Sequence, residues 1–232
     1  MGQDITVSGN DGSFGGYLAT PASGKGPAVV VIQEIFGVNP WVRSVADMMA
    51  AQGYIAVAPD LFWRIAPGVQ LDPTKPDEQK RGFELYGKYD FEKALADIQS
   101  TMTYLRTAPG ASGKVGNMGF CAGGLLSYLC AARTDTDASS SYYGGGISGK
   151  LDLMEKIKKP TLLHLAGVDD FVPTEAQVKI KEAAAGNPNV TVYDYPGVHH
   201  GFCRDIDPRN YDAAACTLAH SRTLALFKSA LA

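Results

Sequence analysis

The segment Gly116-Asn-Met-Gly-Phe-Cys-Ala-Gly-Gly124 decides the fold of this 232-residue chain. Residues 119–123 read G-x-C-x-G, with a cysteine where the nucleophile-elbow motif G-x-S-x-G carries a serine. The partly apolar run 114–118 predicts a short buried strand, and residues 125–132, which contain no helix breaker, predict a buried helix. Cys121 is therefore expected at the apex of a sharp turn between a strand and a helix.

The glycines around Cys121 have a steric reason. Such a turn holds its central residue in a strained backbone conformation, and side chains at the flanking positions would collide with the neighbouring strand and helix. A helix that starts after Cys121 also directs backbone N–H groups and a partial positive charge at the sulfur, which favours the thiolate. The alternative is an apolar cysteine in a glycine-rich turn that carries no chemistry.

Composition limits the classes of protein that fit. Hydrophobic residues make up 45% of the chain and charged residues 19%, which is typical of a soluble globular protein and argues against disorder. The net charge of −3 and the pI near 5.8 give no electrostatic footprint for nucleic acid or for an anionic membrane surface. The length suits one α/β domain over residues 1–232, which we expect to be monomeric.

The cysteines and the apolar runs bear on the compartment. Cys121, Cys130, Cys203 and Cys216 show no C-x-x-C spacing, so neither a zinc ribbon nor a redox pair is expected. The N-terminus lacks the pattern of a secretory signal, and no apolar run approaches the roughly 20 residues that span a bilayer. An even number of cysteines could form two disulfides, but we expect a cytoplasmic protein, in whose reducing environment disulfides are rare.

Strands and helices are expected to alternate along the chain after an N-terminal hairpin. This order predicts the α/β class, with a mostly parallel central sheet covered by helices on both faces. The expected strands cover residues 5–8, 14–19, 28–32, 54–58, 114–118, 138–143, 160–166 and 190–193. The expected helices cover residues 40–52, 88–106, 125–132 and 174–185, with a closing helix that begins at Asp207-Pro208.

Two loops are expected to contribute to a site. Gln33 and Glu34 follow the apolar run 28–32, and such polar side chains are unfavourable at the end of a buried strand unless they face a site. Residues 61–80 contain three prolines, one glycine and two aromatic side chains, and they are expected to form a loop that covers this site.

A thiol needs a base, and the base needs a group that holds its tautomer. His199 and His200 lie in a glycine-flanked loop after a strand, and spacing alone does not choose between them. Asp169 and Asp170 are equally ambiguous as the acid, and a turn with two solvated aspartates is the alternative. The other histidines fit less well, since His164 lies within an apolar strand and His220 within the closing helix.

We expect neither a cofactor nor a bound metal. A metal site built from His199, His200 and either Asp205 or Asp207 is conceivable, but it follows no known ligand spacing.

Four segments together resemble the dienelactone hydrolase family, in unbroken order over nearly the whole chain. They are Gln33-Glu-Ile-Phe-Gly-Val-Asn39, Lys114-Val-Gly-Asn-Met-Gly-Phe-Cys-Ala-Gly-Gly124, Gly167-Val-Asp-Asp-Phe-Val-Pro173 and His200-Gly-Phe202. The resemblance implies an α/β-hydrolase fold, in which the nucleophile, the acid and the histidine follow one another in this order along the chain.

The resemblance also implies catalytic roles. Cys121 matches the family's nucleophile, His200 the base and Asp169 the acid of the triad. Glu34 matches a glutamate that deprotonates the thiol when substrate arrives.

Four further residues match binding positions of the family. The backbone N–H groups of Ile35 and Ala122 match the oxyanion hole, and Arg81 and Arg204 look like the pair that binds a substrate carboxylate. Arg81 lies in a variable stretch. Guanidinium groups suit a carboxylate because they bind it through two parallel hydrogen bonds.

The expected function is the opening of dienelactone (4-carboxymethylenebut-2-en-4-olide) to maleylacetate through an acyl-cysteine, in the degradation of chlorinated aromatic compounds. A related enzyme that acts on other lactones or small esters is the nearest alternative, because loops 61–80 and 201–208 set the pocket. A non-catalytic ligand-binding protein on the same fold is an alternative of another class. A cysteine peptidase fits less well, since a papain-like signature is absent.

Overall fold

The sheet of the computed structural model, which describes residues 2–232, has the strand order β1-β2-β4-β3-β5-β6-β7-β8. The strands are β1 (Gln3–Gly9), β2 (Gly12–Ala19), β3 (Gly26–Ile32), β4 (Ile55–Pro59), β5 (Ala111–Phe120), β6 (Ala138–Tyr142), β7 (Thr161–Val168) and β8 (Val190–His199). Contacts group the residues into two units: one up to Asn117 with Leu231, and one of Met118–Ala230 with Ala232.

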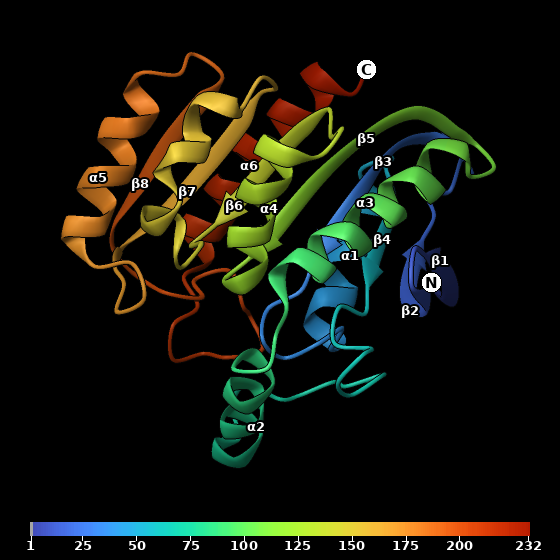
Figure 1. Ribbon diagram of the computed structural model, residues 1–232, viewed down its shortest axis with the longest axis horizontal. Helices are drawn as coiled ribbons and strands as arrows, with labels where there is room; N and C mark the ends of the chain where they lie inside the picture. Colours follow the sequence, from blue (N-terminus) through green and yellow to red (C-terminus); the bar gives the residue numbers. More distant parts are fainter. Residues whose placement is uncertain (1) are drawn as a thin grey trace. The chain divides into compact units, whose positions relative to one another are not determined.

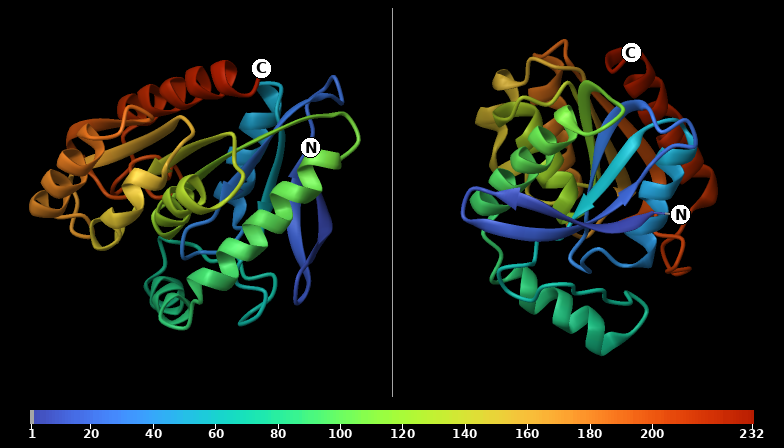
Figure 2. Two further views of the ribbon diagram at one scale, coloured as in Figure 1. Left: turned by 45° about the horizontal axis from the view of Figure 1, so that its top comes forward. Right: turned by 90° about the vertical axis from the view of Figure 1, so that its right-hand side faces the viewer.

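In the first unit, the hairpin of β1 and β2 continues antiparallel into β4, which pairs in parallel with β3. Residues 28–32 of β3 are fully buried, because α1 (Pro40–Ala51) packs on one face of these strands and α3 (Phe91–Thr107) on the other (Figure 2). α1 begins as its sequence predicts, since the Asn39 side chain accepts a hydrogen bond from the N–H of Val42 at 3.1 Å.

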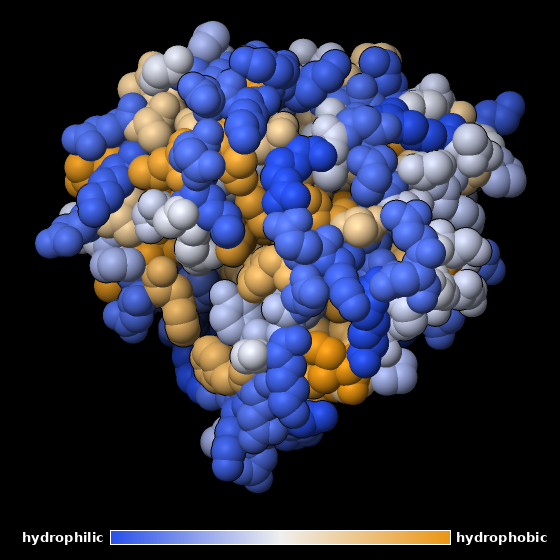
Figure 3. All heavy atoms as spheres, viewed as in Figure 1, coloured by the Kyte–Doolittle hydropathy of each residue, from blue (hydrophilic) through white to orange (hydrophobic). Residues whose placement is uncertain are grey.

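The segment 61–80 is only partly the loop that its sequence predicts. Helix α2 (Pro76–Tyr86) begins inside it, with Pro76 in its first turn beside the acidic Asp77 and Glu78. Proline and acidic residues favour a helix start, so the prediction of loop up to residue 80 was wrong because Pro76 was taken for a breaker. α2 buries only Gly82 and Leu85, and its outer surface is largely hydrophilic (Figure 3).

In the second unit, β6, β7 and β8 are parallel. Helices α4 (Ala122–Arg133) and α5 (Thr174–Ala185) cover one face of these strands, and α6 (Ala213–Ala230) covers the other (Figures 1 and 2). The parallel pairings and the helices on both faces confirm the predicted α/β class in each unit.

On the α6 side of this unit, buried polar side chains bond to one another. His164 Nδ1 lies 2.8 Å from the hydroxyl of Tyr195, and His164 Nε2 lies 3.2 Å from the hydroxyls of Ser140 and Thr223. The interpretation of His164 as a satisfied core residue is therefore confirmed. Burial, together with the charges of His220 and Arg222, lowers the pKa of His164 to about 3.

Two element boundaries in the second unit differ from the predictions. β8 extends through His199, although residues 197–202 were predicted to be a loop. α6 begins at Ala213 instead of Asp207-Pro208, because the carboxylate of Asp212 accepts a hydrogen bond from the N–H of Ala215 and caps this helix. Both differences bring residues 200–212 into one connection between β8 and α6.

The prediction of unpaired cysteines was wrong for one pair. Cys203 and Cys216 form a disulfide, with their Cα atoms 4.8 Å apart, while Cys121 and Cys130 are free. The two paired cysteines are 13 positions apart in the sequence, and no local motif identifies them as a disulfide pair. The connection between β8 and α6 folds back on the helix and brings them together.

None of the helices formed by residues 2–232 has the length and apolar character needed to cross a membrane.

Candidate active site

Cys121 lies at the turn between β5 and α4, in the second unit. Its φ of 55° is in the left-handed region that non-glycine residues rarely adopt. The N–H of Cys121 donates to the carbonyl of Tyr142 at 3.0 Å, and its carbonyl accepts from the N–H groups of Gly124 and Leu125 at 2.9 and 3.2 Å. These backbone bonds hold the strained conformation at the start of a helix, which is typical of a nucleophile elbow.

Gly124 allows α4 to approach β6 closely. A Cβ atom on Gly124 would lie 2.4 Å from the carbonyl oxygen of Tyr142 and 2.8 Å from the Cα of Gly144. Both contacts are with backbone, which cannot move aside as a flexible side chain can. The second glycine after the cysteine thus sets the distance between the helix and the strand.

Asp169 and His200 form a buried pair at the carboxyl ends of β7 and β8. His200 Nδ1 lies 2.9 Å and 3.0 Å from the two carboxylate oxygens of Asp169. The same carboxylate accepts hydrogen bonds from the N–H groups of Phe171 at 2.8 Å and Val172 at 3.1 Å. Asp169 is thus fixed by three donors, and it leaves Nε2 as the ring nitrogen of His200 that can exchange a proton with a reactant.

His200 interacts with Cys121 as well as with Asp169. Burial disfavours the charged imidazolium, but the charge of a Cys121 thiolate and the hydrogen bond to Asp169 outweigh burial and raise the pKa of His200 to about 10. Cys121, His200 and Asp169 thus belong to one interacting group within the second unit.

Aromatic rings hold the imidazole from two sides. The ring of Tyr143 lies 4.9 Å and that of Phe171 4.7 Å from the His200 ring, centroid to centroid. Tyr143 has a φ of 39°, another left-handed non-glycine residue. Its N–H donates to the carbonyl of His164 at 2.8 Å, which holds this conformation at the end of β6.

The neighbouring candidates, His199 and Asp170, lie outside the buried pair of His200 and Asp169. His199 and Asp170 are exposed, whereas His200 and Asp169 are 8% and 7% exposed. The side-chain contacts therefore separate the adjacent residues that spacing alone left ambiguous.

Arg204 lies in the connection after β8 and is 7% exposed. Its Nη2 donates to the carboxylate of Asp207 at 3.1 Å, and Arg209 binds the same carboxylate at 2.7 and 2.8 Å. The arginines lower the pKa of Asp207 against the opposing effect of burial. Asp207, which was expected to start a helix, instead orients two guanidinium groups.

Ala122, the first residue of α4, belongs to the second unit, and the other remaining predicted residues belong to the first unit. Glu34 and Ile35 directly follow β3 and are 1% and 5% exposed. Gln33 connects them to the next strand, since its side-chain oxygen accepts from the N–H of Leu61 at 3.1 Å. The carboxyl end of β3 therefore carries a buried acid, as its sequence predicted.

The segment after β4 covers this loop of the first unit. The N–H of Leu71 donates to the carbonyl of Phe36 at 2.9 Å, and a single bridge pairs Gly37 with Gln70. Residues 70 and 71 thus lie against the loop that follows β3 in this unit.

Arg81, on α2, is exposed and forms an ion pair with Glu84 at 3.3 Å. An exposed pair of this kind contributes little to stability, so its guanidinium can exchange Glu84 for another carboxylate.

Three residues near His200 were not found from the sequence. Tyr143 and Phe171 contact its ring, and Gln177 donates to the carbonyls of Ala166 and Val172 at 2.9 and 2.8 Å, which fixes the loop of the acid. For Phe171, the signal was its place in the G-x-D-x-F-V-P segment. Tyr143 and Gln177 give no local signal, because an aromatic residue before glycines and a glutamine in a helix are common.

A strained cysteine at the start of a helix, a buried carboxylate and an imidazole, in this order along the chain, are the parts of a nucleophilic hydrolase. With the mostly parallel sheet, they define an α/β hydrolase.

The chain belongs to the dienelactone hydrolase family, whose model matches residues 14–231. A carboxymethylenebutenolidase of Cupriavidus pinatubonensis is 38% identical over 97% of this chain and 95% of its own length. A protein of Azospirillum brasilense that bears the same name provisionally is 44% identical over 98% and 99% of the two chains. The crystal structure of a provisionally assigned dienelactone hydrolase from Klebsiella pneumoniae covers 98% of each chain, with 26% identity and a TM-score of 0.84. The protein is thus a carboxymethylenebutenolidase-like hydrolase.

Proposed function

We propose that the protein opens dienelactone to maleylacetate with Cys121 as the nucleophile. The environment of His200 carries this proposal. Its Nδ1 lies 2.9 Å from the Asp169 carboxylate, and the charge of a Cys121 thiolate raises the pKa of its imidazole. The names of the relatives support the lactone as the substrate, since they are called carboxymethylenebutenolidases.

In the proposed reaction, the Cys121 thiolate attacks the lactone carbonyl carbon and forms a tetrahedral oxyanion. The oxyanion accepts hydrogen bonds from the N–H groups of Ile35 and Ala122, each of which can contribute about 3 kcal/mol to the transition state. The ring C–O bond then breaks, the enolate leaves, and a thioester remains on Cys121. The enolate takes a proton and becomes the ketone of maleylacetate.

Water completes the proposed cycle. His200 removes a proton from a water molecule, the hydroxide attacks the thioester carbonyl, and the second tetrahedral oxyanion collapses to the carboxylic acid and the Cys121 thiolate. The acid loses its proton to solvent, and the thiolate takes up the proton that His200 holds. Asp169 holds the imidazole in the tautomer that this step requires. Glu34, buried at the end of β3, is proposed to take the thiol proton when substrate arrives.

The proposed substrate is an anion, and Arg81 and Arg204 are proposed to bind its carboxylate. Two features support this assignment. Arg81 is exposed and paired only weakly, and Arg204 is oriented by Asp207 in a buried setting. Degradation of chlorinated aromatic compounds by a monomer in the cytoplasm is the setting proposed for this reaction.

The experiment compares the hydrolysis of dienelactone with that of a neutral aryl ester. Arg81→Ala and Arg204→Ala should each lower kcat/KM for dienelactone by about 10- to 150-fold, the worth of one charged hydrogen bond, and leave the ester almost unchanged. Lys80→Ala removes a neighbouring charge from α2 and is the matched control.

Hydrolysis of the ester without any hydrolysis of dienelactone would contradict the proposed substrate and favour the broader esterase. Stoichiometric binding of dienelactone without turnover would favour a binding protein.

A further inference from the structure

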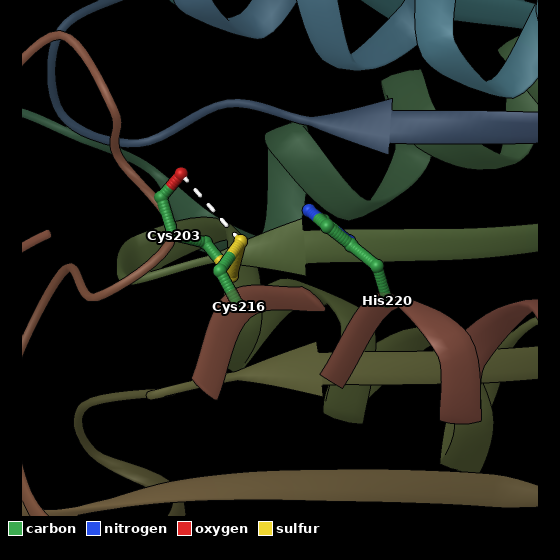
Figure 4. A group of neighbouring side chains, drawn as sticks. All are labelled: Cys203, Cys216 and His220. Atoms are coloured by element: carbon green, nitrogen blue, oxygen red, sulfur yellow. Dashed lines mark hydrogen bonds between the residues drawn. A yellow bond between two sulfur atoms is a disulfide. The ribbon is translucent and has the colours of Figure 1, made fainter. Parts of the chain in front are cut away.

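Cys203, Cys216 and His220 form a second cluster of reactive side chains in the second unit, at the start of α6. Their sulfur and ring-nitrogen atoms all lie within 4.8 Å of one another. Figure 4 shows the His220 ring directed toward the two sulfur atoms, which come from α6 and from the connection after β8. The proposed hydrolysis uses none of these side chains.

Three features of this cluster match a metal site. Cys216 and His220 are four residues apart on α6, so their side chains share one face of the helix. Both cysteines are buried, with exposed fractions of 2% and 6%. The spread of 4.8 Å is close to the roughly 4 Å between ligands in a tetrahedral site with Zn–S bonds of about 2.3 Å.

The imidazole is also held by a further partner. His220 Nδ1 lies 3.2 Å from the hydroxyl of Tyr142, which in turn lies 2.6 Å from the hydroxyl of Thr223. Metal-binding histidines are typically oriented in this way through the ring nitrogen that does not bind the metal. The bond to Tyr142 therefore leaves Nε2 of His220 as the ligand atom.

We propose that Cys203, Cys216 and His220 bind one soft divalent metal ion, such as Zn²⁺, when the cysteine pair is reduced. Two thiolates and an imidazole are the ligands that such ions prefer, and they leave a fourth position for water or another ligand. The disulfide seen in the structure is the oxidised form of the same site, which cannot bind the ion.

The chemistry of the two forms balances. A small dithiol reduces the disulfide by two electrons and two protons and becomes a cyclic disulfide, which leaves the thiols of Cys203 and Cys216. Zn²⁺ then binds both sulfur atoms and releases the two thiol protons to solvent. Since Cys203 precedes Arg204, either form ties the connection that carries this arginine to α6.

The first test is a titration with Co²⁺, whose bonds to thiolates give a charge-transfer band. The chain carries Cys121→Ser so that the catalytic thiol cannot contribute, and it is reduced, treated with a chelator and desalted. We expect one equivalent of Co²⁺ to bind, Zn²⁺ to displace it, and the oxidised chain to show no band. Absence of the band in the reduced chain would overturn the proposal.

Variants locate the site. Cys203→Ser and Cys216→Ser should each abolish the band, whereas Cys130→Ser, which removes the other buried cysteine, should keep it. Tyr142→Phe should weaken the affinity by about 10-fold, as the loss of an outer hydrogen bond to a ligand does. A band that persists in both Cys203→Ser and Cys216→Ser would contradict the proposal.

A second measurement needs no variant of the cluster. Zn²⁺ should protect Cys203 and Cys216 from a maleimide in the reduced chain, as read by peptide mass spectrometry, and should leave the labelling of Cys130 unchanged. Equal labelling of Cys203 and Cys216 with and without Zn²⁺ would overturn the proposal even if the serine variants failed to fold.

Discussion

At the scale of single residues, neighbours of the same type have different environments in the candidate site. Asp169 accepts hydrogen bonds from His200, Phe171 and Val172, whereas Asp170 is exposed. A carboxylate fixed by three donors can hold one tautomer of an imidazole, and a solvated carboxylate cannot. The adjacent pairs 169/170 and 199/200 therefore offer matched controls.

The first prediction concerns the acid. Asp169→Asn should lower kcat for dienelactone by about 10²- to 10⁴-fold, because His200 loses the group that sets its tautomer. Asp170→Asn, which changes a neighbouring exposed carboxylate in the same way, should have almost no effect. Steady-state kinetics of both variants measures this, and equal losses would contradict the role of Asp169.

The second prediction concerns the charge of His200. Cys121→Ser should lower the pKa of His200 from its value of about 10, because the thiolate that favours the imidazolium is lost. A pH titration followed by NMR of the imidazole nitrogens measures this shift, with His199→Gln as the control for assignment. An unchanged pKa would show that Cys121 does not interact with His200.

The same pKa also affects stability. Since the folded-state pKa of His200 lies above the unfolded value of about 6.5, its contribution to stability is fully present below pH 6.5. That contribution should be lost as the pH rises through about 10.

At the scale of elements, the turn from β5 into α4 depends on close backbone contacts. Gly124 lies where any Cβ would meet the backbone of Tyr142 and Gly144 at 2.4 and 2.8 Å. The pattern G-x-C-x-G-G predicted this turn because its spacing is local. The need for glycine at position 124 becomes clear only from the end of β6, which lies against it.

The third prediction follows from this contact. Gly124→Ala should lower the free energy of unfolding by about 1–3 kcal/mol through overpacking. Gly149→Ala, at a glycine with open space around it, should change it by less than about 0.5 kcal/mol. Denaturation with guanidinium chloride measures both, and equal effects would contradict the close approach of α4 to β6.

Other elements show why sequence patterns reach only part of the site. α1 and the strand at residues 28–32 were predicted well, because a cap and a β-branched run are local signals. α2 was missed when a first-turn proline was taken for a breaker. The connection between β8 and α6 could not be predicted, since Asp207 and the Cys203–Cys216 disulfide act through contacts distant in sequence.

At the scale of the whole molecule, composition and the order of the elements predicted the α/β class. Side-chain contacts were out of reach from the sequence, and Tyr143 is the clearest case. Its left-handed conformation and its contact with His200 arise from the arrangement of β6, β7 and β8. A pattern along one segment cannot show them.

The fourth prediction concerns acid stability. His164 has a folded-state pKa near 3 and an unfolded value near 6.5, so the unfolded chain binds more protons between these values and acid favours unfolding. Lowering the pH from 6.5 to 4.5 should therefore lower the free energy of unfolding by about 2 kcal/mol through this residue. His164→Gln should reduce the pH dependence by that amount, and His199→Gln, at an exposed site, should not. Equal pH dependence in both variants would contradict the buried neutral histidine.

The most direct test of the thiol mechanism is intact-protein mass spectrometry during the hydrolysis of dienelactone, with Cys121→Ala and an alkylated sample beside the unchanged chain. We predict turnover and an acyl adduct on Cys121 in the unchanged chain, and neither in the other two samples. Full turnover by Cys121→Ala would contradict the mechanism and leave the fold without its proposed nucleophile.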